Sequence, residues 1–141
     1  MSEGRKEGKD RQRAKPGRNE GDRKVIFDTN SLLVPAQFGV DVFDEVERLV
    51  GGYEGLVPQV VVEEVRELDE DGAEMGLEMA LENCDVVEDE GEYADNTVVS
   101  LAEEEGDAVV TNDSELRERV LDAGVPVIYL RQKSYLEIQK P

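Results

Sequence analysis

The stretch AVVTNDSELRERVLDAGVPVIYL, residues 108–130, decides the fold because its hydrophobic periodicity changes twice. Ala108–Thr111 and Val125–Leu130 are short runs of β-forming apolar residues. Between them, Ser114–Ala123 carries apolar residues at helical spacing and follows Asn112 and Asp113, which favour helix starts. A strand, a helix and a second strand joined by short turns predict parallel pairing in an α/β fold.

The same alternation continues toward both ends of the chain. We expect further strands at Val25–Phe27, Leu56–Val57 and Asn83–Val87. Expected helices are a brief turn at Ser31–Leu33 that Pro35 breaks, then Val40–Val50, Pro58–Asp69, Gly72–Glu82 and Ala94–Glu104. The segment after Leu130 is expected to be a loose end. Together these elements predict a three-layer α/β/α, Rossmann-like domain around a central parallel sheet of about four to five strands.

The chain divides by composition into a tail and one domain. Residues 1–23 are predicted to be a flexible basic tail, and residues 24–141 a single domain with one core. The tail has no apolar run and no aromatic residue, so we expect neither a secretory signal nor a membrane anchor. Contact with RNA phosphates and a merely solubilising role both remain open for it.

Charge is distributed unevenly. Residues 1–24 carry nine Lys/Arg and five Asp/Glu, whereas the remaining 117 residues carry 7 basic and 30 acidic side chains. A domain this acidic repels itself and other polyanions unless salt screens it, and the Debye length falls to about 3 Å at molar salt. The composition therefore indicates a halophilic protein of a salt-rich cytoplasm, and most of the acids are expected only to solvate the surface.

Cysteine and histidine usage excludes several mechanisms. Cys84 is alone, so neither a disulfide framework nor a cysteine-rich zinc site is possible within this sequence. The absence of histidine excludes Ser-His-Asp chemistry, imidazole bases and His-ligated zinc. Carboxylates and water must perform any acid–base step.

Five acidic residues lie at the ends of predicted elements rather than in charge runs: Asp28, Glu64, Asp95, Asp107 and Asp113. Ligands of an open parallel sheet gather outside the carboxyl ends of its strands. Asp28 and Asp113 follow strands, while Glu64 and Asp95 lie near helix starts that face the same rim. Asp107 precedes a strand at the opposite end, where a turn role suits it better. Four carboxylates are therefore expected to converge.

Each of these acids also has a plainer structural role that stays open. Asp95 suits a helix N-cap, Asp113 a charge in a first helical turn, and Asp28 an Asx-turn. Asn112 with Glu115 three residues later has the outline of a capping box. None of these roles excludes metal binding.

Helical geometry separates Glu63 from Glu64. With Val61 at zero and about 100° per residue, Glu64 lies at about 300°, beside the apolar stripe, and Glu63 at about 200°, on the water-facing side. We therefore expect Glu64, not Glu63, to contribute to the site.

The segments VIFDTNSLLVPAQFGVDVFDEVERL, VPQVVVEEVREL, YADNTVVSLA and GDAVVTNDSELRERVLDAGVPVIYLR resemble the PIN domain family in order and spacing, across residues 24–133. The LLVPAQFGVD and VPVIYLR segments are more similar to archaeal PIN proteins related to the eukaryotic pre-ribosomal RNA endonuclease than to VapC toxins, which are the second choice. Two departures stand out. Asn96 occupies a position where a second aspartate is common, and the zinc ribbon of the ribosome-maturation nuclease is missing.

The resemblance implies a divalent-metal-dependent endoribonuclease that acts in rRNA processing or RNA turnover. Its catalytic residues and metal ligands would be Asp28, Glu64, Asp95 and Asp113, and its cofactor Mg²⁺ or Mn²⁺, which prefer oxygen ligands. The polar residues beside these acids are expected to bind substrate: Asn30, Ser31, Thr111, Asn112 and Arg117. The implied substrate is RNA, either rRNA or tRNA. A homodimer, an antitoxin and a ribosomal assembly partner remain open.

Three alternatives are weighed against this interpretation. A haloacid-dehalogenase phosphatase needs a second acid two residues after the first, where this chain has Asn30. A receiver domain needs an acidic pair before its first helix and a lysine at a late strand end, and Lys133 is poorly placed for that. A PIN-fold RNA-binding or ribosome-assembly protein with little activity is the stronger competitor, although the intact set of acids argues against it.

Overall fold

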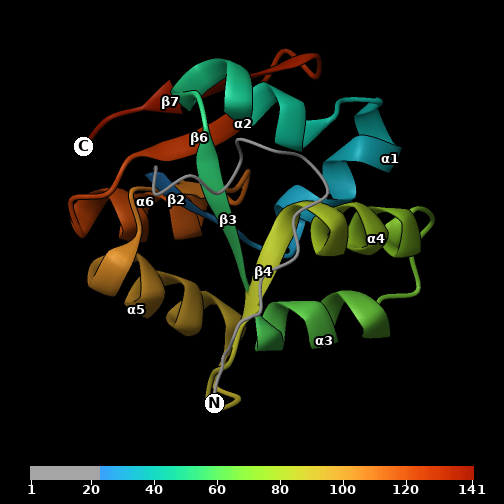
Figure 1. The fold of residues 1–141 in the computed structure, drawn as a ribbon, viewed down its shortest axis with the longest axis horizontal. Helices are drawn as coiled ribbons and strands as arrows, with labels where there is room; N and C mark the ends of the chain where they lie inside the picture. Colours follow the sequence, from blue (N-terminus) through green and yellow to red (C-terminus); the bar gives the residue numbers. More distant parts are fainter. Residues whose placement is uncertain (1–22) are drawn as a thin grey trace.

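One sheet with the strand order β4-β3-β2-β5-β6-β7 runs through the part of the chain that the structure describes, residues 23–141 of a computed structural model (Figure 1). The central strand β2 (Arg23–Phe27) pairs in parallel with β3 (Tyr53–Pro58) and β5 (Ala108–Val110). Further out, β4 (Cys84–Val87) and β6 (Val127–Arg131) continue the parallel pattern. The carboxyl ends of these strands therefore share one edge of the sheet, called the carboxyl rim below.

Helices cover both faces of this sheet. They are η1 (Asn30–Leu33), α1 (Val34–Phe38), α2 (Val42–Val50), α3 (Gln59–Glu67), α4 (Ala73–Asn83), α5 (Ala94–Glu105) and α6 (Ser114–Asp122). Neighbouring residues of β2 point to opposite faces. The Phe27 ring meets Phe43 of α2 with 4.9 Å between ring centroids, whereas Ile26 lies against Gly106 at the end of α5. The three-layer α/β/α prediction is confirmed.

Burial on both faces explains the sequence of the central strands. Val25, Ile26 and Phe27 are fully buried, as are Val109 and Val127 on the neighbouring strands. A strand covered on both sides reads as a continuous apolar run rather than an alternating one. This core holds the carboxyl rim rigid, and the candidate functional residues are attached to it.

The expectation of a loose end after Leu130 is wrong. β7 (Tyr135–Gln139) pairs antiparallel with β6 and adds a sixth strand, with Leu136 buried. The connecting turn places Gln132 and Lys133 at positive φ, 54° and 58°, without the glycine or asparagine that normally signals such a turn. The strand is also anchored to α2, since Arg48 Nη2 donates to the Leu136 carbonyl at 2.8 Å.

Pro35 does not break the first helical segment, contrary to expectation. It occupies the first turn of α1, where the missing N–H has no helical partner to lose. The helix ends instead at Gly39, which adopts a left-handed conformation with φ of 69°.

Residues 1–22 lie outside the described residues, so the flexible basic tail stays a prediction, and β2 already begins at Arg23. In residues 23–141 no helix is both long and apolar enough to cross a membrane.

Candidate functional site at the carboxyl rim

Asp28 directly follows β2 and is held by hydrogen bonds on both carboxylate oxygens. The Ser31 N–H donates to Oδ1 at 2.8 Å, and the Thr111 hydroxyl donates to Oδ2. The carboxylate is 4% exposed. Burial raises the pKa of Asp28 to about 7, while the hydrogen bonds from Thr111 and Ser31 lower it and the charge of Asp95 raises it further. Asp28 thus bonds the backbone three residues on rather than two, so it forms no Asx-turn in the strict sense, and its role in a site stays a prediction.

Asp113 lies where β5 leads into α6, and it is the N-cap of that helix. Its Oδ1 accepts from the N–H groups of Glu115 at 2.9 Å and Leu116 at 3.0 Å. The cap is thus Asp113 rather than Asn112, which the capping-box outline suggested. The Asp113 N–H also donates to Thr111 Oγ1 at 3.0 Å. Thr111 therefore links Asp28 and Asp113 through one hydroxyl.

Asn30 and Asn112 connect the ends of three strands. The Asn112 N–H donates to Asn30 Oδ1 at 3.0 Å, and Asn112 Oδ1 accepts from the Leu130 N–H at 2.7 Å. These bonds tie the segment after β2 to β5 and β6. Both amide oxygens are used inside the protein, so only the two side-chain NH₂ groups are left to contact another molecule.

Asp95 lies in the first turn of α5, where it exerts an electrostatic influence on the other predicted acids. The N-cap of α5 is Tyr93, so the N-cap prediction for Asp95 is wrong. Its carboxylate forms no hydrogen bond within residues 23–141. Burial raises the pKa of Asp95, the charge of Asp113 raises it next, Arg119 lowers it, and Glu64 and Glu115 raise it. Because Asp95 also raises the pKa of Asp28, it interacts with all three other predicted acids.

Glu64 and Glu63 are both exposed on α3 but have different neighbours. The Thr29 hydroxyl, next to Asp28, donates to Glu64 Oε1, which brings α3 to the segment after β2. Glu63 instead accepts from Gln59 Nε2 on its own helix at 3.3 Å. Sequence reasoning missed Thr29, although its position beside Asp28 with a hydroxyl side chain was the available signal.

The two arginines of α6 point in different directions. Arg117, predicted to bind substrate, lies over the Tyr129 ring with 4.9 Å from its guanidinium carbon to the ring centroid. Arg119 Nη2 donates to Asn96 Oδ1 at 2.8 Å, next to Asp95 in α5. Arg119 is therefore the arginine whose charge acts on the acids, and the sequence did not separate it from Arg117.

Comparisons with known proteins identify the family of this chain. Residues 25–133 match the family described as PIN like domain. The chain belongs to the PIN domain family. It is 31% identical to Ribonuclease VapC4 of Methanocaldococcus jannaschii over 125 residues, which cover 82% of this chain and 95% of the relative. It is 32% identical to Ribonuclease VapC9 of Archaeoglobus fulgidus over 123 residues, covering 82% and 89%.

The PIN fold is also evident from a solved structure, that of the PIN domain endonuclease Utp24. The similarity has a TM-score of 0.72 and covers 84% of this chain and 92% of the other, at 21% sequence identity. At that identity the likeness shows the fold. The predicted family and the predicted fold are thus both confirmed.

Asp107 lies at the opposite end of the PIN domain sheet, as predicted. Its Oδ2 accepts from the Lys24 N–H at 2.8 Å, and its own N–H donates to the Lys24 carbonyl at 2.8 Å. Asp107 therefore joins the start of β5 to β2 and is distant from the carboxyl rim.

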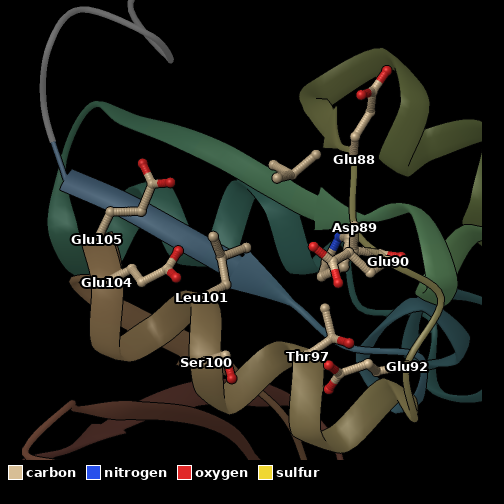
Figure 2. A pocket seen from close by; sticks show the side chains of 11 residues that line it. Glu88, Asp89, Glu90, Glu92, Thr97, Ser100, Leu101, Glu104 and Glu105 are labelled. Carbon is tan, nitrogen blue, oxygen red and sulfur yellow. The ribbon is translucent and has the colours of Figure 1, made fainter.

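A pocket of about 370 Å³ lies between α5 and the loop that follows β4 (Figure 2), and none of the four predicted acids lines it. Figure 2 shows the loop that follows β4 on one side and the α5 residues Thr97, Ser100 and Leu101 on the other. Its walls are strongly acidic, with Glu88, Asp89, Glu90, Glu92, Glu104 and Glu105. Asp89 is used structurally, because it accepts from the Val60 N–H at 2.9 Å and from the Gly91 N–H at 2.9 Å.

The donor chemistry at the rim suits a hard divalent cation. Asp28, Glu64, Asp95 and Asp113 offer only oxygen ligands, and the chain has no histidine. The raised pKa values of Asp28 and Asp95 mark negative charge that a cation would neutralise. In residues 23–141 no three acidic or cysteine side chains lie close enough to hold an ion as they stand. Joint ligation of one ion would therefore require these side chains to move closer together.

Proposed function

We propose that this PIN domain protein is an endoribonuclease that hydrolyses RNA phosphodiester bonds at the carboxyl rim with bound Mg²⁺ or Mn²⁺. The observation that carries the proposal is the position of Asp95, whose charge interacts with Asp28, Glu64 and Asp113 from three other segments. Two relatives that bear the name ribonuclease support it, because their similarity extends over most of both chains.

Asp28, Asp95, Asp113 and Glu64 are assigned as metal ligands and catalytic residues. A divalent ion bound by such carboxylates supplies Lewis-acid activation of a water molecule and of the phosphate. Asp28 is the rigid member, since Ser31 and Thr111 hold both of its oxygens. Glu64 is exposed and held beside Asp28 by the Thr29 hydroxyl, so we assign it the role of accepting a proton from the attacking water.

Substrate contacts are assigned to the polar residues that surround these acids. The side-chain NH₂ groups of Asn30 and Asn112 are donors for phosphate or ribose oxygens, and Ser31, Thr111 and Arg117 lie in the same segments. We propose rRNA or tRNA as the RNA, and the cytoplasm as the place of action. We also propose that the protein forms a homodimer and binds a ribosomal assembly partner. Residues 1–23 are proposed to contact RNA.

A toxin-type ribonuclease is a second form of this function. The names of the two relatives, Ribonuclease VapC4 and Ribonuclease VapC9, favour it. In that case expression of the protein should arrest growth, and a neighbouring gene should encode an antitoxin that relieves the arrest. A processing nuclease predicts neither result.

The decisive experiment measures RNA cleavage in molar KCl by the purified protein. We expect cleavage with Mg²⁺ or Mn²⁺, none in EDTA, and none by Asp28→Asn or Asp113→Asn, whose folds are checked by circular dichroism. Asp107→Asn is the matched control, because it removes an acid at the far end of the sheet. Sequencing the cleaved transcripts identifies the RNA. Undiminished cleavage by both rim variants, or a wild type that binds RNA without cleaving it, contradicts the proposal and favours a scaffold.

A further inference from the structure

The acidic pocket beside α5 has no basic side chain in its lining, whereas α6, which packs on α5, carries Arg117 and Arg119. On one side the acidic pocket carries six carboxylates from the loop after β4 and from α5 (Figure 2). On the other side α5 faces α6, where Arg119 meets Asn96 at 2.8 Å. Asn96 is not among the residues that line the pocket, although Ser100, one turn further along α5, is. The acidic lining of the pocket repels a phosphodiester backbone. On α6 the two arginines lie among Glu115, Glu118 and Asp122, so attraction there depends on the contact that Arg119 itself makes.

Arg119 forms no ion pair with a carboxylate in the part of the chain that the structure describes. In residues 23–141 the ion pairs of Lys24, Arg48 and Arg131 each join a cation to a glutamate, whereas Arg119 forms no ion pair. The partner that holds Arg119 is a neutral amide oxygen. A guanidinium has five N–H donors in a planar fork, and the bond to Asn96 uses one of them. The remaining donors match the oxygens of a phosphate.

The hydrogen bond to Asn96 holds the guanidinium of Arg119 beside the residue that follows Asp95. Its charge acts on Asp95, which interacts with the other three acids. A cation at this position would stabilise the negative charge that develops on the phosphate during hydrolysis. Arg117 is less suited to this task, because its guanidinium already lies over the Tyr129 ring.

Resting on the proposed ribonuclease function, we infer that Arg119 binds an RNA phosphate next to the scissile bond, that Asn96 positions it, and that the RNA backbone crosses the rim on the α6 side. The acidic pocket then defines the side from which RNA is excluded. The hydrogen bond that Arg119 donates to Asn96 orders the long arginine side chain before RNA binds, which lowers the entropy cost of binding.

The first test compares Arg119→Met with Arg66→Met. Both changes remove one exposed positive charge, and Arg66 lies in the last turn of α3 on the helix face opposite Glu64. We expect Arg119→Met to lower kcat/KM for a short single-stranded RNA about ten-fold or more, as loss of a charged hydrogen bond does. Arg119→Lys should recover part of this loss, Arg66→Met should stay near wild type, and all variants should keep the wild-type Tm.

Salt dependence separates a phosphate contact from a structural role. Each phosphate contact to single-stranded RNA contributes about 0.7 to the slope of log affinity against log salt. We expect Arg119→Met to lose about that amount and Arg66→Met to lose none. Asn96→Ala keeps the charge, so it should keep the slope while lowering kcat/KM a few-fold. Equal slopes and equal kcat/KM for Arg119→Met and Arg66→Met would overturn the inference.

A binding measurement keeps this inference separate from the ribonuclease proposal. The same substitutions are made in an Asp28→Asn background, and affinity for the same RNA is measured in EDTA over a range of KCl concentrations. A slope change specific to Arg119 supports the phosphate contact even if the wild type cleaves nothing, a result that would sink only the ribonuclease proposal. A wild type that cleaves RNA beside an Arg119 variant with an unchanged slope overturns only the role of Arg119.

Discussion

The Thr111 hydroxyl donates a hydrogen bond to Oδ2 of Asp28, although 83 positions separate the two residues in the chain. The Thr111 hydroxyl oxygen in turn accepts from the Asp113 N–H at 3.0 Å, so the Thr111 side chain links two of the proposed metal ligands. β2 and β5 are neighbours in the sheet, and this pairing places the three residues together.

Thr111→Val should therefore impair the site without changing its shape. The substitution keeps the volume but leaves a buried carboxylate oxygen without its donor, which costs about 1–3 kcal/mol of stability. Because the Thr111 hydrogen bond lowers the pKa of Asp28, its loss should move the pH–rate profile to higher pH. Thr111→Ser restores the hydroxyl and should restore the profile. A profile that is identical in Thr111→Val and wild type would contradict this prediction.

Asp28→Asn should stabilise the metal-free protein at high pH. Burial raises the pKa of Asp28 from 3.8 to about 7, so the folded state binds the proton more tightly than the unfolded state does. The stabilisation of the folded state by protonation of Asp28 is fully present below pH 3.8 and is lost as the pH rises to about 7. Asparagine does not ionise, so the Asp28→Asn variant keeps a neutral side chain at every pH. This variant should therefore be more stable than wild type by about 2–4 kcal/mol at pH 8.

The measurement is urea unfolding of both proteins in EDTA and molar KCl between pH 4 and pH 8. Other acids titrate in both proteins, so the difference between the two curves isolates Asp28. A difference that stays constant across this range would show that Asp28 is ionised throughout.

Glu64→Gln should reduce RNA cleavage much more than Glu63→Gln. The two changes are chemically identical on adjacent exposed residues, yet only Glu64 meets Thr29 at the rim. Loss of a carboxylate that accepts a proton should lower kcat by about a hundred-fold or more. Glu63→Gln should stay within about two-fold of wild type, as expected for a solvated surface charge. The measurement is the single-turnover cleavage rate of each variant. Equal losses of rate in Glu64→Gln and Glu63→Gln would contradict the assignment of Glu64 to the site.

Gly76→Ala should destabilise the protein even though alanine favours helices by about 1 kcal/mol. A Cβ on Gly76 would lie 1.8 Å from the Leu32 carbonyl oxygen, so α4 and η1 would have to separate. Forcing such a contact costs about 1–3 kcal/mol net of repacking. The control is Glu78→Ala on the exposed side of the same helix, which should leave stability nearly unchanged. Thermal unfolding of both variants tests the difference.

Local patterns predicted most of the fold. The run VIF before Asp28 and the alternation across residues 108–130 identified parallel strands, because burial on both faces selects continuous apolar residues. The position of the acids at strand ends and helix starts predicted that they would converge, since parallel strands end on one rim. Long-range anchoring escaped this reasoning. β7 is held by β6 and by Arg48 of α2, and neither contact leaves a local signal.

The sequence by itself determined the fold class, the family and the four acids at the rim, because these depend on periodicity and on the residues that end each element. Only the tertiary structure decided that Asp113 caps α6, that Thr29 meets Glu64, and that Arg119 rather than Arg117 faces the acids. Each of these outcomes depends on the direction of a side chain and on a partner from a distant segment. Spacing along a chain specifies neither, whereas packing of the helices on the sheet specifies both.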